Sequence, residues 1–237
     1  MKLPSQPPEI DHLLLDPSPK VDPYEIMDIF PTPFYITKRD SELDSTEEKE
    51  LEKKEIEDII KNELYPAPNE AGNLTTKNTY ILNTGKLKKL KQFIEKHIDI
   101  YVQKIISPKT EANFYITQSW LSVTEPGQSH QAHWHQNSLI SGTFYISTDE
   151  NDRITIRDPN VHIKGTLSFE VKDFNPWNAD KMHLSADTNM LYLFPSWVAH
   201  EVPINTTAST NRVTIAFNVF AKGSFGTAET NSQLILK

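Results

Sequence analysis

The chain has 237 residues, which is enough for one large domain with its own core. Its 24 lysines and arginines are outnumbered by 32 aspartates and glutamates, and a formal net charge of −8 makes nucleic acid an unlikely main ligand. The chain contains no cysteine, which excludes disulfides and thiolate chemistry, so a bound metal needs histidine or carboxylate ligands. No apolar run approaches ~18 residues and the start lacks an apolar leader, so we expect a cytoplasmic protein that does not cross a membrane.

The first 31 residues predict an extended N-terminal arm. They hold seven of the 16 prolines, which remove backbone donors and stiffen the chain. Apolar patches at 13–15 and 26–30 are unusual for a pure linker, so we expect the arm to pack on the body or on a protein partner. Residues 32–237 are expected to form a single domain.

Two amphipathic helices are predicted after the arm. Ser45 and Glu48 have the spacing of a capping box, and the apolar stripe that follows predicts a helix at about 45–64. A second apolar repeat predicts a helix at about 86–106. His97 falls inside this second stripe, where a hydrogen-bonded core histidine is expected.

From residue 113 onward the pattern changes to short β-branched and aromatic runs separated by turn residues. Helices followed by a series of strands favour an antiparallel sandwich or barrel with helices on one face. The predicted strands are 34–36, 114–124, 138–147, 154–156, 166–171, 190–194 and 212–220.

A cluster of histidines is the strongest chemical signal. Because side chains two positions apart on a strand share a face, the imidazoles of His133 and His135 can meet one ion. This pair alone is equally compatible with two solvated side chains. In a regular strand His130 would point away from both, unless it belongs to the preceding turn at Pro126 and Gly127. An apolar strand also leads to His200, and the burial of a histidine at a strand end suggests an ion or a hydrogen bond as its partner.

A strictly alternating strand follows twelve residues later, with Arg212, Thr214, Ala216 and Asn218 on one face. An arginine on an inward face needs an anionic partner, because an unpaired buried charge is very costly. That partner can be the carboxylate of a ligand, which a guanidinium binds in bidentate fashion, or an internal aspartate or glutamate.

These motifs, in this order, resemble the 2-oxoglutarate and Fe(II)-dependent oxygenase superfamily, and within it a branch of oxygenases common in marine bacteria and phages. The resemblance covers about residues 78–220 and implies a mainly β fold with α, a double-stranded β-helix (jelly roll) backed by N-terminal helices. It also implies a dioxygenase that uses Fe(II), 2-oxoglutarate and O2 to hydroxylate an unknown substrate. The stretches that carry the resemblance are His133 to His135, Asn137 to Tyr145, Leu193 to His200 and Arg212 to Asn218.

By position in these motifs, the resemblance makes His133, His135 and His200 the metal ligands and Arg212 the residue that holds the far carboxylate of 2-oxoglutarate. The family usually has an aspartate or glutamate where His135 stands. No acid lies between Glu125 and Asp149 to replace it. Further candidates are Thr214, Tyr145 and Asn137 for binding the co-substrate and Trp120, Trp134 and Trp197 for pocket walls, although strand aromatics more often belong to the core.

Two alternatives remain open. One is a three-histidine metalloenzyme that does not use 2-oxoglutarate, in which Arg212 should pair with a protein carboxylate. The other is a non-catalytic structural or binding module, such as a component of a phage particle, which would be virion-associated and take up no metal.

Overall fold

The computed structural model describes most of the chain beyond the N-terminal arm. The chain divides into two units, Met1–Thr32 and Pro33–Lys237, and the helices and strands given below belong to the second. The predicted arm lies almost entirely outside the described residues, so its packing stays a prediction. None of the described helices is long and apolar enough to span a membrane. The described residues are 26, 28–40, 44–68, 71–109, 112–160, 170–207 and 209–237.

Two helices occupy the regions where the sequence predicts them. Helix α1 (Thr46–Glu63) begins with the predicted capping box: the Ser45 hydroxyl accepts from the Glu48 backbone N–H at 3.2 Å, and the Glu48 carboxylate accepts from the Ser45 backbone N–H at 2.9 Å. Helix α2 (Lys88–Tyr101) continues as a π-helical segment, Val102–Ile106.

The larger of two antiparallel sheets has the order β1-β9-β6-β11-β4-β3-β2, and β12 also pairs with β11. Its long central strands, β4 and β11, correspond to the strongest alternating runs in the sequence. The strands of this sheet are β1 (Tyr35–Lys38), β2 (Leu64–Pro66), β3 (Leu74–Thr76), β4 (Ala112–Thr124), β6 (Ile140–Ser147), β9 (Met190–Pro195), β11 (Arg212–Phe225) and β12 (Leu234–Leu236).

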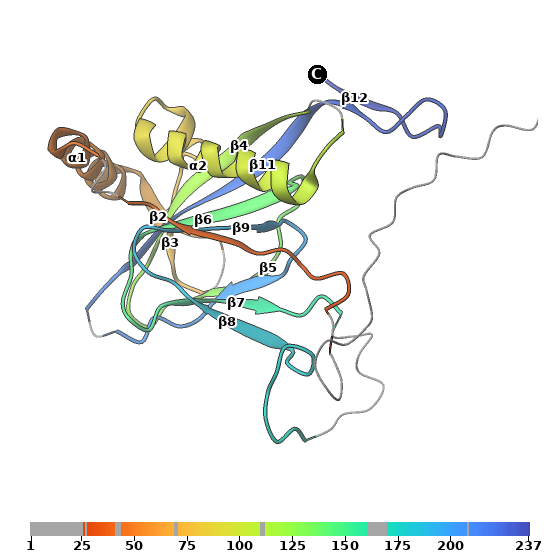
Figure 1. The fold of residues 1–237 in the computed structure, drawn as a ribbon. Coiled ribbons are helices and arrows are strands. Elements are labelled where there is room, and N and C mark those ends of the chain that lie inside the picture. Colours follow the sequence, from red (N-terminus) through yellow and green to blue (C-terminus); the bar gives the residue numbers. More distant parts are fainter. Residues whose placement is uncertain are drawn as a thin grey trace, which may run out of the picture. The chain divides into compact units, whose positions relative to one another are not determined.

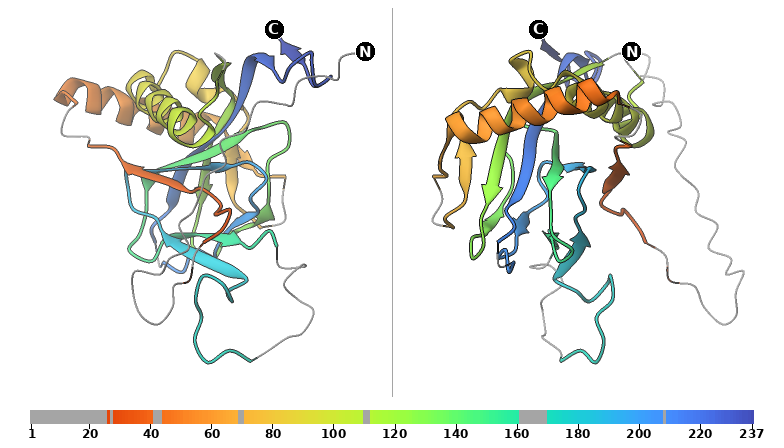
Figure 2. Two further views of the ribbon diagram at one scale, coloured as in Figure 1. Left: turned by 45° about the vertical axis from the view of Figure 1, so that its right-hand side comes forward. Right: turned by 90° about the vertical axis from the view of Figure 1, so that its left-hand side faces the viewer.

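The smaller sheet has four strands in the order β5-β10-β7-β8. Both helices lie on one side of the larger sheet, and the smaller sheet lies on its other side (Figures 1 and 2). The predicted fold class is therefore confirmed, a mainly β jelly roll backed by two helices. The strands of the smaller sheet are β5 (His130–His133), β7 (Arg153–Arg157), β8 (Lys181–Ser185) and β10 (His200–Val202).

Two apolar clusters follow these layers. The first joins the helices to the larger sheet, and it includes Leu90 and Ile94 of α2 and Ile215 and Phe217 of β11. The second lies between the sheets and consists of Tyr145, Ile154, Ala186, Tyr192, Phe194 and Val198. The odd-numbered residues of β11 thus belong to the helix-side core, which leaves the even-numbered residues for the space between the sheets.

His97 lies beside the first cluster. Its Nδ1 is 2.7 Å from the Tyr35 hydroxyl, and its ring centroid is 4.5 Å from that of Phe93. Desolvation lowers the pKa of His97, with a smaller contribution from the charge of Lys96. The predicted core histidine is therefore hydrogen-bonded and half-buried.

Candidate metal centre

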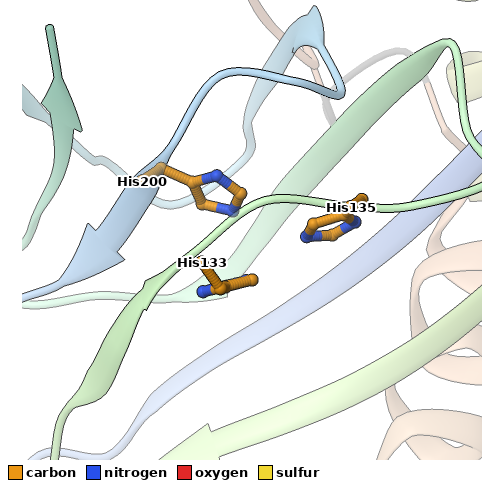
Figure 3. A group of neighbouring side chains, drawn as sticks. All are labelled: His133, His135 and His200. Atoms are coloured by element: carbon orange, nitrogen blue, oxygen red, sulfur yellow. The ribbon is translucent and has the colours of Figure 1, made fainter. Parts of the chain in front are cut away.

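Three histidines from two neighbouring segments converge between the sheets. His133 is the last residue of β5, His200 is the first residue of β10, and these two residues are paired in the antiparallel ladder. His135 follows β5, and its backbone N–H donates to the Ser196 carbonyl at 3.0 Å. One ligand nitrogen from each ring lies within 4.8 Å of the other two, and the rings border a common space (Figure 3).

The hydrogen bonds of these rings define which nitrogen is free. In each ring Nδ1 faces a carbonyl oxygen, which can only accept, so Nδ1 carries the hydrogen and Nε2 keeps its lone pair. This is the arrangement that orients metal-binding histidines in proteins. The three contacts are His133 to the Gln131 carbonyl at 2.8 Å, His135 to the Asn218 side-chain oxygen at 2.5 Å, and His200 to the Val198 carbonyl at 3.1 Å.

Burial keeps the three rings neutral. Desolvation, reinforced by the neighbouring imidazoles, lowers the pKa of His133 to about 4 and that of His200 to about 3. Desolvation also lowers the pKa of His135. Because imidazole binds a metal only in its neutral form, all three rings can act as ligands at neutral pH. Three neutral imidazoles suit Fe(II) and other borderline divalent metals, so the ligand set fits the predicted ion.

The histidines border a cavity between the two sheets. Apolar and aromatic side chains form much of its wall, including Trp120, Tyr145 and Phe194. The Trp120 ring centroid lies 5.7 Å from that of His135. Arg212 and Thr214, two successive inward residues of β11, line the same cavity. The predicted metal ligands and the predicted carboxylate-binding residues therefore share one cavity.

Arg212 also has an internal carboxylate partner. Its Nε donates to Asp152 Oδ1 at 2.7 Å, its Nη2 donates to the same oxygen, and its Nη1 donates to the Pro203 carbonyl at 3.3 Å. Both side chains of the pair are 4% exposed. The ion pair with Asp152 is expected if the protein does not use 2-oxoglutarate. The position of Arg212 in the cavity is expected if the protein does use 2-oxoglutarate. Asp152 was missed because nothing in its polar turn distinguishes it from its acidic neighbours.

Three predicted residues lie outside the lining of this cavity. Trp134 and Trp197 are 60% and 55% exposed. Asn137 adopts a left-handed turn conformation, with φ of 53°, and lines a separate hollow with Tyr80 and Gln118.

His130 does not point away as it would in a regular strand, because it lines the cavity and its ring centroid is 4.2 Å from that of His133. A bulge explains the difference. Between the pairs His200–His133 and Val202–His130, β10 advances two residues while β5 advances three. The extra residue turns His130 to the side that His133 occupies.

Comparisons with known proteins agree with this geometry. Residues 118–218 match a family described as "Putative 2OG-Fe(II) oxygenase". This family is named after Fe(II) and 2-oxoglutarate, which are the two predicted cofactors. No curated protein matches the sequence.

Solved structures with a similar fold include a prolyl-4-hydroxylase from Pseudomonas putida, with a TM-score of 0.52 and 13% identity over 79% of this chain and 92% of that one. The non-heme alpha-ketoglutarate-dependent carbocyclase SnoK from nogalamycin biosynthesis has a TM-score of 0.55 and 12% identity over 81% of each chain. HygX from Streptomyces hygroscopicus, solved with nickel and 2-oxoglutarate bound, has a TM-score of 0.51 and 9% identity over 79% of this chain and 82% of that one. At these identities the likeness concerns the fold, and the match over residues 118–218 supports the resemblance of the chain to the 2-oxoglutarate and Fe(II)-dependent oxygenase superfamily.

Proposed function

We propose that the protein is an Fe(II)- and 2-oxoglutarate-dependent dioxygenase that hydroxylates a C–H bond of its substrate. The observation that carries this proposal is the convergence of three neutral imidazoles on a cavity that Arg212 and Thr214 also line. When bound, Fe(II) with 2-oxoglutarate supplies O2 activation, in which 2-oxoglutarate is converted to succinate and CO2 and the substrate receives a hydroxyl group.

In this proposal each group of the chain has one task. The Nε2 atoms of His133, His135 and His200 hold the metal and leave part of its coordination sphere open for the co-substrates. The walls formed by Trp120 and Phe194 keep water away from the reacting atoms.

Arg212 remains able to bind a second carboxylate. A guanidinium has five N–H groups, and the contacts to Asp152 and Pro203 use Nε and one hydrogen on each terminal nitrogen. Two N–H groups are left for the far carboxylate of 2-oxoglutarate, and the hydroxyl of Thr214 lines the same cavity. Arg212 would then be shared between Asp152 and the co-substrate.

The buried Asp152 carboxylate favours a second candidate, a three-histidine metalloenzyme that does not use 2-oxoglutarate. Asp152 already neutralises Arg212, so a dianionic co-substrate would meet a like charge beside the guanidinium. In this alternative Arg212 and Asp152 are a structural pair, and the cavity holds only the metal and the substrate.

An anaerobic titration separates these candidates. Fe(II) is added to the protein first and 2-oxoglutarate second, and the visible absorption is recorded after each addition. The proposed function predicts a charge-transfer band that requires both additions, disappears in His133→Ala and is weakened in Arg212→Ala. Trp197→Phe, at an exposed position outside the cavity, is the control and should keep the band.

The other possible outcomes of this titration distinguish between the alternative functions. Iron binding by the wild-type protein without any response to 2-oxoglutarate would support the second candidate. A folded wild-type protein that binds no iron would contradict both candidates and support a non-catalytic module. Where the band appears, addition of O2 should convert 2-oxoglutarate to succinate.

A further inference from the structure

The three candidate ligands are not held in the same way. The rings of His133 and His200 each hydrogen-bond a backbone carbonyl two residues earlier in the chain, which any sequence can supply. His135 instead hydrogen-bonds a side chain, with Nδ1 2.5 Å from Oδ1 of Asn218 on β11. The orientation of His135 therefore depends on the identity of a residue 83 positions away.

The backbone around Asn218 is fixed by a bulge in the adjacent strand. Asn218 pairs with Gln118 of β4, but the next residue, Val219, pairs with Ile116, so Thr117 is an extra residue in β4. The Thr117 hydroxyl donates to the Asn218 carbonyl at 3.1 Å. Asn218 is 8% exposed. Its side chain is thus presented from an irregular point of the sheet, as is common next to functional sites.

A chain of serine hydroxyls leaves the Asn218 oxygen available to His135. Ser141 donates to Ser196 at 2.8 Å, Ser196 donates to Ser138 at 2.8 Å, and Ser138 donates to the Ile140 carbonyl at 3.0 Å. Each hydroxyl has one hydrogen, and in this order none of the three hydrogens is directed at Asn218. Ser141 lies 3.5 Å from Asn218 Oδ1, so it is at most a weak competitor there.

The same serine chain also holds the backbone of His135. The carbonyl of Ser196 accepts the His135 backbone N–H at 3.0 Å, while the Ser196 hydroxyl is the middle member of the chain. Both the position and the ring orientation of His135 therefore come from one connected group of polar residues. The two other rings have no such group among the described contacts.

We propose that Asn218 is the positioning residue that makes His135 a metal ligand. By accepting from Nδ1–H, it selects the tautomer whose Nε2 lone pair faces the common point of the three rings. A neutral imidazole can then serve at the position where the family usually has a carboxylate. This inference rests on the metal centre of the proposed function but not on any reaction with 2-oxoglutarate.

The tautomer can be read directly in the full-length, metal-free protein by two-dimensional 15N–1H correlation of the imidazole nitrogens, with the His135 signals assigned from His135→Gln. In the wild type, Nδ1 of His135 should carry the hydrogen. In Asn218→Leu, which removes the acceptor at similar volume, the Nε2–H tautomer should appear. In Asn218→Asp, which keeps an oxygen acceptor, the wild-type tautomer should be retained.

Metal affinity provides the second readout. Calorimetric titration with Co2+ should show binding weakened about 10–100-fold in Asn218→Leu, the usual effect of losing a partner that orients a ligand, and restored in Asn218→Asp. Asn205→Leu is the matched control, because it removes another buried amide, one that donates to the Thr124 and Thr210 carbonyls. It should change neither the tautomer nor the affinity, whatever it does to stability.

An unchanged His135 tautomer and Co2+ affinity in Asn218→Leu would show that Asn218 only fills space. If Asn218→Leu does not fold, Asn218→Ser, which is too short to reach the ring, takes its place with the same expectations. A protein that shows these effects but never turns over 2-oxoglutarate would contradict the proposed function and leave the role of Asn218 intact.

Discussion

Removal of Asp152 is the perturbation that most directly probes the cavity. Asp152 and Arg212 are both almost fully buried, so Asp152→Ala leaves a guanidinium without its charge partner in a low-dielectric region. Removing one member of a buried ion pair costs about 3–5 kcal/mol. The substitution also removes the acceptor of the Asp149 backbone N–H, which lies 2.9 Å from Asp152 Oδ2. Urea unfolding should therefore show a large loss of stability.

The proposed function adds a second expectation for the same variant. If Arg212 binds 2-oxoglutarate, the co-substrate becomes the only anionic partner of the guanidinium, so 2-oxoglutarate should bind more tightly than to the wild type and restore part of the stability. At a free concentration of 100 times its dissociation constant, a ligand stabilises the folded state by about 2.7 kcal/mol. The measurement is the urea midpoint of the Zn2+-loaded variant with and without 2-oxoglutarate.

Asp187→Ala is the matched control, because Asp187 is 60% exposed and forms a surface ion pair with Lys38 at 3.5 Å. Such pairs contribute about 0–1 kcal/mol, so little change is expected. The reasoning about the buried pair is refuted if Asp152→Ala is no less stable than this control. If the variant is destabilised but gains nothing from 2-oxoglutarate, the buried pair is real and the second candidate function is supported.

Three further predictions concern stability. In Gly142→Ala the new Cβ would lie 2.2 Å from Cζ of Phe217 in a filled core. Thermal unfolding should therefore show that the free energy of unfolding decreases by about 1–3 kcal/mol, and an unchanged stability would mean that this core is loosely packed. Burial holds the pKa of His133 at about 4 and that of His200 at about 3, so the unfolded chain takes up protons first as the pH falls below ~6.5. The urea midpoint of the metal-free protein should therefore decrease from that pH toward about pH 4, and a midpoint that does not change with pH would contradict this reasoning. Ser45→Ala removes the N-cap acceptor of α1 and should cost ~1 kcal/mol in urea unfolding, whereas Ser45→Asp should not.

Sequence reasoning worked best where a pattern was long. The alternation through β11 and the apolar runs of β4, β6 and β9 identified the centre of the larger sheet. The ordered histidines indicated the superfamily that the match over residues 118–218 supports. Strands β2, β3, β10 and β12 have three residues each, too few to carry a period, and they exist only because neighbouring strands pair with them. The predicted strand at 166–171 lies largely outside the described residues.

Two features of the site depend on contacts that the sequence does not encode locally. The inward position of His130 results from a single extra residue in β5, and a simple two-residue period cannot anticipate a bulge. The partner of Arg212 lies 60 residues earlier in the chain, in a turn with several acids, so only the folded structure selects Asp152 among them. The choice between a ligand and an internal carboxylate as partner was therefore open until the fold was known.

The candidate metal ligands are three imidazoles with no carboxylate among them, and this has an electrostatic consequence. Neutral imidazoles add no charge, so the two positive charges of a divalent ion and the two negative charges of 2-oxoglutarate would cancel completely between the sheets. A carboxylate ligand would leave one net negative charge in the same low-dielectric space, where uncompensated charge is costly. The loaded cavity would thus carry no net charge, because the buried Arg212 and Asp152 also neutralise each other.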